Sequence, residues 1–152
     1  MASAKGLCYA LNKPLITLVS LEILAASALQ QISIQDNELP ALLCPMIDAR
    51  RMEVFTAIYD INLVNITPPS AMVLDEGSFS SHLLKNKVFF FGSGATKWAT
   101  VCKHPNASLL SISVLPEAMG MLANKLYLEG SFAELANSQP LYLKEFHDSI
   151  KG

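Results

Sequence analysis

The chain has 152 residues and a formal net charge of −2, from 11 Lys and Arg against 13 Asp and Glu. Hydrophobic residues make up 51% and charged residues 16%, which excludes a wholly disordered chain because such chains are rich in charge and poor in apolar residues. The near-neutral balance argues against a protein that grips nucleic acid unaided, since phosphate binding needs a concentrated Lys and Arg surface. At this length we expect one domain, or two small subdomains that share a core.

The first 40 residues predict two helices around a buried strand. Ala2–Leu11 is predicted to be a helix. Leu15–Val19 is a continuous apolar run with β-branched residues, which is typical of a strand buried on both faces. We expect Ser20 to cap a helix over Leu21–Ile32. The polar stretch Gln35–Glu38 that follows is the predicted subdomain boundary.

From residue 42 onward the pattern changes to strands that lie close together in the sequence. Leu42–Asp48 and Met52–Tyr59 are predicted to form an antiparallel hairpin, because a short polar turn separates two apolar runs. A third strand is expected over Leu63–Ile66 and Met72–Leu74, interrupted by the two consecutive prolines between them.

The remaining elements alternate between helices and strands. The predicted elements are a helix over Ser78–Leu84 capped by Ser78, a strand over Val88–Phe91, a helix near Ala95–Cys102, a strand over Ser108–Ile112 and a helix over Glu117–Leu128 that begins at Pro116. The order from residue 42 is therefore β-β-β-α-β-α-β-α. This order predicts a ribonuclease-H-like α/β domain, with a mixed sheet flanked by helices.

The sequence points to a cytoplasmic protein. Cys8, Cys44 and Cys102 are an odd number and widely spaced, so we expect neither a disulfide framework nor a cysteine zinc site, but small buried hydrophobes in a reducing compartment. The most apolar stretch, Leu15–Leu29, is shorter than the roughly 20 residues of a membrane helix and contains Glu22. We therefore expect no membrane association.

Two polar segments are candidate chemical sites. Gly92, Ser93 and Gly94 lie between a predicted strand and helix, where backbone N–H groups could hold a nucleotide phosphate; a plain tight turn is the other interpretation, because the P-loop lysine is missing. In the predicted hairpin turn, the carboxylates of Asp48 and Glu53 could act as acid and base. The alternative, which we favour, is a solvated turn.

In that turn we expect Asp48 to pair with Arg50 or Arg51 and to serve structure rather than catalysis. His82, His104 and His147 stand alone, without the spacing of helix-borne zinc ligands, so no metal site is predicted. No nucleophile motif occurs, and no catalytic residue is assigned.

Four stretches of the chain, in order, resemble one protein family. They read A-K-G-L-C-Y-A-L from Ala4, S-L-E-I-L-A from Ser20, I-D-A-R-R-M-E-V-F from Ile47 and P-L-Y-L-K from Pro140. Together they resemble the TsaB family of bacterial tRNA threonylcarbamoyladenosine biosynthesis proteins, also called the glycoprotease or M22-like family. The resemblance spans nearly the whole chain, although members of the family have a longer N-terminal segment before the first of these motifs.

The resemblance implies a fold of the actin, Hsp70 and sugar-kinase type, which has two ribonuclease-H-like lobes. On this interpretation residues 1–38 are the remnant of an N-terminal lobe that is otherwise missing, and residues 39–152 form the C-terminal lobe. It implies a non-catalytic subunit of TsaD, the catalytic relative that transfers a threonylcarbamoyl group to adenosine beside the tRNA anticodon. The alternative is an enzyme, either a peptidase or a nucleotide hydrolase that uses Gly92–Gly94.

The resemblance also implies the partners. We expect a TsaD-like subunit, with a TsaE-like ATPase as a further candidate, contact with tRNA only through the complex, a homodimer in isolation and no bound cofactor, with ATP as the alternative. The apolar stripes of the first two helices are the predicted partner interface. Its residues are Ala4, Leu7, Cys8, Leu11, Leu21, Leu24, Ala25, Ala28 and Leu29.

Overall fold

The computed structural model describes residues 1–33 and 39–143, and within these ranges the fold is built on one mixed sheet. Its five strands lie in the order β3-β2-β1-β4-β5, with β1–β2 and β2–β3 antiparallel and β1–β4 and β4–β5 parallel. The strands are β1 (Ala41–Asp48), β2 (Glu53–Asp60), β3 (Asn65–Val73), β4 (Lys87–Phe91) and β5 (Ala107–Leu110). This arrangement confirms the predicted ribonuclease-H-like lobe and its antiparallel hairpin.

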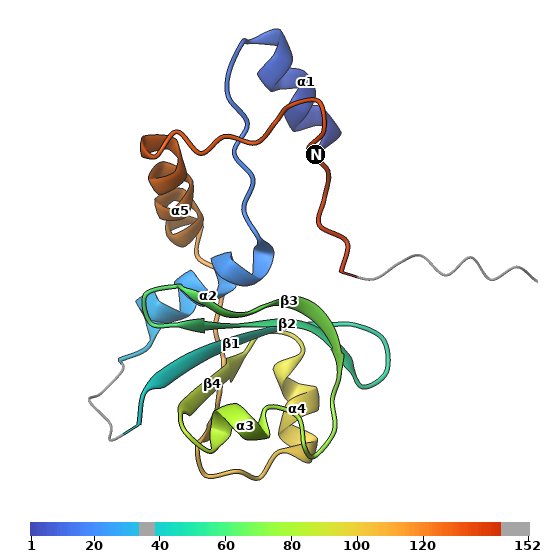
Figure 1. Ribbon diagram of the computed structural model, residues 1–152, viewed down its shortest axis with the longest axis vertical. Helices are drawn as coiled ribbons and strands as arrows, with labels where there is room; N and C mark the ends of the chain where they lie inside the picture. The colour runs from blue at the N-terminus through green and yellow to red at the C-terminus, as the bar shows by residue number, and fades with distance from the viewer. Residues whose placement is uncertain (34–38, 144–152) are drawn as a thin grey trace, which may run out of the picture.

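Helices cover both faces of the sheet (Figure 1). The shorter ones, α3 and α4, lie on one face, while α2 lies on the other and α5 lies beyond α2. The N-terminal helix α1 lies farther from the sheet, at the end of an extended segment. The helices are α1 (Ala2–Ala10), α2 (Ser20–Gln31), α3 (Ser80–Leu83), α4 (Ala95–Val101) and α5 (Pro116–Leu128).

The central strand β1 explains why the sheet needs cover on both faces. Side chains of a strand alternate between the two faces, and β1 is apolar at nearly every position. Leu42, Cys44 and Met46 join the core beneath α3 and α4, whereas Leu43 joins the core beneath α2. The hydrophobic effect therefore stabilises helices on both sides of this strand.

An aromatic cluster fills the core on the α3 and α4 side. Phe79, Phe90 and Trp98 are buried, with ring centroids 5.2–5.4 Å apart. Trp98 and two of the three consecutive phenylalanines, Phe90 and Phe91, are buried, as large aromatic side chains in a core usually are. The third, Phe89, is half-buried.

On the opposite face, α2 contributes its whole apolar stripe to the core. Its stripe contacts Leu43, Ala57, Tyr59 and Phe91 of the sheet. The fully buried Ser27 donates its hydroxyl to the Ile23 carbonyl (2.8 Å) and accepts the Leu115 N–H (3.0 Å), which positions the start of α5. The sheet, α2 and α5 thus form successive layers.

The predicted strand Leu15–Val19 is wrong. Only Leu15 forms a β-bridge, to Ala133, and the segment otherwise runs as an extended chain between α1 and α2. The apolar, β-branched pattern favours extended backbone, but a strand exists only where a neighbouring chain completes its hydrogen bonds. Among the described residues, no second chain segment lies beside Ile16–Val19 in a ladder.

The expected interruption of the third strand is also wrong, because β3 runs continuously through Pro68 and Pro69. Proline cannot donate to a ladder and is tolerated on an edge strand, which is where β3 lies. The β2–β3 register shifts near Ile58, opposite the segment that holds the prolines.

Several smaller expectations need correction or lie outside the described residues. Neither serine caps its helix: α2 follows Val19 and α3 follows Phe79, in both cases without a side-chain cap, and Ser78 bonds to Asp75 instead. The boundary at Gln35–Glu38 and the residue His147 fall outside the described ranges.

All three cysteines are free, but only Cys44 is buried, so the expected burial is wrong for Cys8 and Cys102. Desolvation raises the pKa of the Cys44 thiol to about 12, which keeps it protonated and unreactive near neutral pH. No helix in the described parts of the chain is long and apolar enough to cross a bilayer.

Candidate functional site

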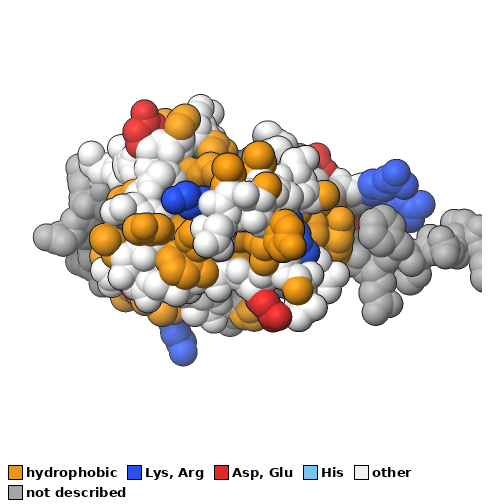
Figure 2. All heavy atoms as spheres, turned by 90° about the horizontal axis from the view of Figure 1, so that it is seen from above, with side chains coloured by type: hydrophobic (Ala, Val, Ile, Leu, Met, Phe, Trp, Pro, Cys, Tyr) orange, Lys and Arg blue, Asp and Glu red, His pale blue; other side chains and the backbone are white. Residues whose placement is uncertain are grey.

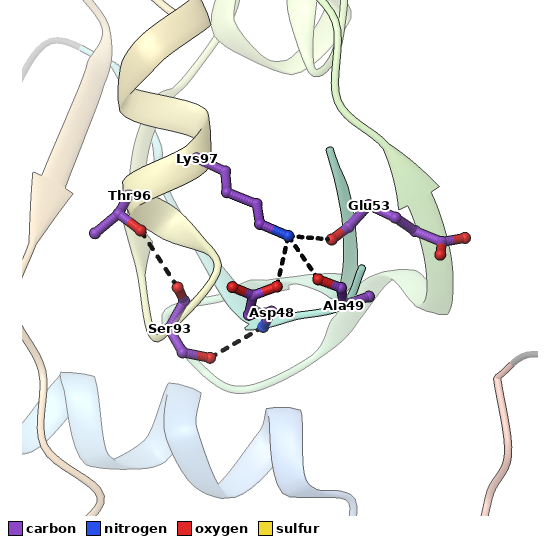
Figure 3. Close-up of polar contacts among 6 residues, drawn as sticks. All are labelled: Asp48, Ala49, Glu53, Ser93, Thr96 and Lys97. Carbon is purple, nitrogen blue, oxygen red and sulfur yellow. Dashed lines mark hydrogen bonds and ion pairs between the residues drawn. The ribbon is translucent and has the colours of Figure 1, made fainter. Parts of the chain in front are cut away.

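A dense polar cluster lies where the β1–β2 turn meets α4 (Figure 3). The Lys97 ammonium, which α4 contributes, donates to the Asp48 carboxylate (2.5 Å) and to the backbone carbonyls of Ala49 (2.6 Å) and Glu53 (3.2 Å). On the other side of the turn, the Ser93 hydroxyl accepts the Asp48 backbone N–H at 2.9 Å. Ser93 and Lys97, which both follow β4 in the sequence, thus hold the two ends of the hairpin turn.

The expected pairing of Asp48 with Arg50 or Arg51 is wrong, because the carboxylate pairs with Lys97. Both arginines lie exposed at the tip of the turn, and Arg51 adopts a left-handed backbone with φ of 58°. The partner instead comes from a helix 49 positions later in the sequence, which the parallel pairing of β1 and β4 brings alongside. Sequence spacing within the turn contains no signal for that contact.

The geometry of this cluster favours a structural use. A lysine ammonium has three N–H donors, and three oxygens of the turn accept them. The Lys97 side chain is only 18% exposed, whereas that of Asp48 is 49% exposed. Lys97 therefore ties α4 to the hairpin, and the exposed carboxylate adds a modest ion pair.

The backbone around Gly92, Ser93 and Gly94 is similarly occupied. Gly92 has φ of 96°, and a Cβ built there would lie 2.3 Å from the Met46 carbonyl oxygen. The Gly94 N–H donates to that same carbonyl (3.1 Å), and the Ala95 N–H donates to Gly92 (3.1 Å). Close packing on β1 therefore accounts for the two glycines, and these contacts favour the tight-turn interpretation over a phosphate loop.

The histidines remain separate where they are described. His82 lies in α3, and His104 accepts the Asn106 N–H in the turn before β5 (3.2 Å). Within residues 1–33 and 39–143, no group of three or more His, Cys, Asp or Glu side chains is placed to hold a metal ion.

The predicted partner interface divides between core and surface. On α2, Leu21, Leu24, Ala25 and Ala28 are at most 6% exposed and pack on the sheet, so this stripe does not form an open surface. Leu29 is half-buried beside them.

On α1 the predicted residues do reach the surface. Ala4, Leu7 and Leu11 are exposed, while Cys8 is half-buried and its thiol lies 3.5 Å from the Pro14 carbonyl. Lys5 fastens the helix by donating to the carbonyls of Ala136 and Ser138.

Apolar residues of α5 add to this surface, and sequence reasoning missed them. Figure 2, which views the molecule from its α1 end, shows hydrophobic side chains over much of the face, with charged groups mostly toward its edge. The exposed apolar residues of α5 are Met119, Met121, Tyr127 and Leu128. The sequence could have indicated their exposure, because these residues lie outside the helical stripe of α5 that packs on α2.

The sheet topology and the contacts of the β1–β2 turn define the chain as a ribonuclease-H-like lobe. Its hairpin is held by α4, the helix that follows β4. Residues 1–126 match the family model of TsaD, described as tRNA N6-adenosine threonylcarbamoyltransferase. The chain belongs to this family. Comparison with the curated proteins gives no significant match.

Solved structures share the fold. One is described as an uncharacterized protein with similarity to peptidase YeaZ from Pseudomonas aeruginosa; it is 21% identical, with a TM-score of 0.70 over 94% of this chain. Another, YeaZ from Pseudomonas aeruginosa, is 23% identical, with a TM-score of 0.67 over 93% of this chain. This chain spans 65% of the length of each.

Gly92, which is tightly packed, and Gly120, which has open space around it, together test the packing argument. Gly92→Ala should lower the free energy of unfolding by roughly 2–4 kcal/mol. An alanine at this position must adopt a left-handed backbone, and its Cβ meets the Met46 carbonyl oxygen. Gly120→Ala, on α5 with nothing near its Cβ, should instead raise it by about 0.5–1 kcal/mol. Urea unfolding measures both; equal stability of the two variants would contradict the packing argument.

The brace at the hairpin is tested by removing its charge. Lys97→Met should lower the free energy of unfolding by about 1–3 kcal/mol, because the Ala49 and Glu53 carbonyls lose their shared donor. Asp48→Asn should cost less than about 1 kcal/mol, since that carboxylate is half-exposed. Lys85→Met, at an exposed lysine, is the control and should change little. If Lys97→Met left the free energy of unfolding unchanged, the contacts of Lys97 would contribute nothing to stability.

Proposed function

We propose that the chain acts as a TsaB-like, non-catalytic subunit in threonylcarbamoylation of the adenosine beside the tRNA anticodon. The observation that carries the proposal is the match of residues 1–126 to the TsaD family. Among the structures of similar fold, one is YeaZ and another is described as similar to peptidase YeaZ, and the motifs of the chain resemble the TsaB family.

The contacts of the candidate site support a non-catalytic role. Lys97 donates to three oxygens of the chain itself, and the Gly94 N–H is used by β1. The groups best suited to acid–base or phosphate chemistry are thus engaged in holding the lobe together. The subunit then acts by binding and supporting a TsaD-like catalytic partner, and it reaches tRNA only through the complex.

The exposed side of α1 is the proposed docking surface for that partner. Leu7 and Leu11 lie one helical turn apart and are 62% and 63% exposed. Exposed apolar side chains on a helix are suited to burial against a partner helix, and small neighbours such as Ala4 allow a close approach. A TsaE-like ATPase would join the assembly, and in isolation the same surface would pair two copies.

The test is a calorimetric titration of the purified chain with a TsaD-like subunit. Changing Leu7 and Leu11 together to Asp should raise the dissociation constant at least ten-fold, because charge would be buried at the interface. Leu84→Asp is the matched control, since Leu84 is 72% exposed and directly follows α3, a helix on the face of the sheet opposite α2; it should bind as the unmodified chain does.

Three results would contradict the proposal. Unchanged binding by the double variant at Leu7 and Leu11 would show that the interface lies elsewhere. Absence of binding by the unmodified chain would show that it is not a partner of the TsaD-like subunit. Turnover of ATP or of a glycoprotein by the chain alone, lost on Lys97→Met, would make it an enzyme.

A further inference from the structure

Helix α1 carries the proposed docking surface, although it contributes no buried side chain to the core. It has nine residues and contains Gly6, which lowers its helix propensity, and no side chain caps its N-terminus. A helix of this length is marginal on its own in water. Its order therefore depends on contacts with the rest of the chain.

Lys5 provides two such contacts. Its ammonium donates to the carbonyls of Ala136 (2.9 Å) and Ser138 (3.0 Å), which are 131 and 133 positions away in the sequence. The segment after α5 runs across to α1 and brings these carbonyls to it (Figure 1). That segment forms a braced turn, because the N–H and the hydroxyl of Ser138 both donate to the Glu134 carbonyl. Lys5 therefore attaches α1 to a fixed point.

The attachment also sets which side of α1 faces outward. Successive residues of an α-helix are rotated by about 100°, so Leu7 and Leu11 lie roughly 200° and 240° around the axis from Lys5. The exposure agrees with this geometry, since Lys5 and Cys8 are half-buried whereas Leu7 and Leu11 are 62% and 63% exposed. Holding Lys5 against the turn directs the two leucines away from the chain.

We infer that Lys5 is a positioning residue for the docking of a TsaD-like subunit: its bonds to the turn keep α1 folded and present Leu7 and Leu11 to the partner. This inference rests on the proposed function, because it concerns the same surface. A partner that meets a preformed helix does not have to order it, whereas the cost of ordering a loose helix would be subtracted from the affinity. Lys5 thus acts on docking without having to contact the partner.

The test replaces Lys5 and follows both the helix and the docking. Lys5→Met keeps most of the side-chain length but removes the ammonium. In the free chain, the amides of α1 should then exchange hydrogen at least about three-fold faster, while those of β1 and β4 keep their rates. In a calorimetric titration with the TsaD-like subunit, the dissociation constant should rise at least about five-fold.

Two further variants separate positioning from charge. Lys5→Arg retains donors for the two carbonyls and should restore both the α1 exchange rates and the affinity to within about two-fold of the unmodified chain. Lys13→Met removes the same charge from an exposed side chain just beyond α1 and should change neither measurement.

The outcomes distinguish this inference from the proposed function. If the unmodified chain binds the TsaD-like subunit but Lys5→Met binds equally well, the inference is overturned and the proposed function stands. Equal weakening by Lys13→Met, or no recovery in Lys5→Arg, would also overturn it, because the effect would then come from charge or from the local sequence. Absence of binding by the unmodified chain would overturn both.

Discussion

The close approach of Gly92 to β1 is the contact on which the rest of the structure depends. At this point the turn after β4 touches the Met46 carbonyl and the Leu24 side chain of α2, so two neighbouring strands and a helix meet around a residue without a Cβ. The same carbonyl accepts the Gly94 N–H, which sets the direction of α4. Because α4 starts there, Lys97 reaches the hairpin turn and holds it.

This contact also decides how the apolar surface of the chain is used. Seating the turn beneath α2 draws the stripe of that helix onto the sheet, where it covers Leu43 and Phe91. The stripe is therefore satisfied within the lobe, whereas α1 and the outer side of α5 keep apolar residues at the surface. The stripe of α2 is thus closed to a partner, whereas the exposed apolar side chains of the outer helices are accessible.

The sequence could predict what depends on local pattern. The hairpin, the order of elements from β1 to α5 and the burial of Trp98 follow from apolar periodicity and turn residues. What depends on contacts between distant segments could not be predicted: the partner of Asp48 lies on a helix 49 positions away, and an apolar stripe indicates that a face is buried without indicating against what. For the same reason Leu15–Val19 has the pattern of a strand while lacking a neighbouring strand in the described chain, and β3 passes through two prolines because it lies at an edge.

Hydrogen–deuterium exchange of the full chain, resolved by helix, tests most directly the claim that α2 belongs to the core. Amides of α2 should exchange as slowly as those of β1, because opening α2 requires exposing the layer that contains Leu24 and Phe91. Amides of α1, which has no buried residue, should exchange much faster. If the amides of α2 exchanged at the rate of those of α1 while β1 remained protected, α2 would not belong to the core. Its apolar stripe would then be exposed.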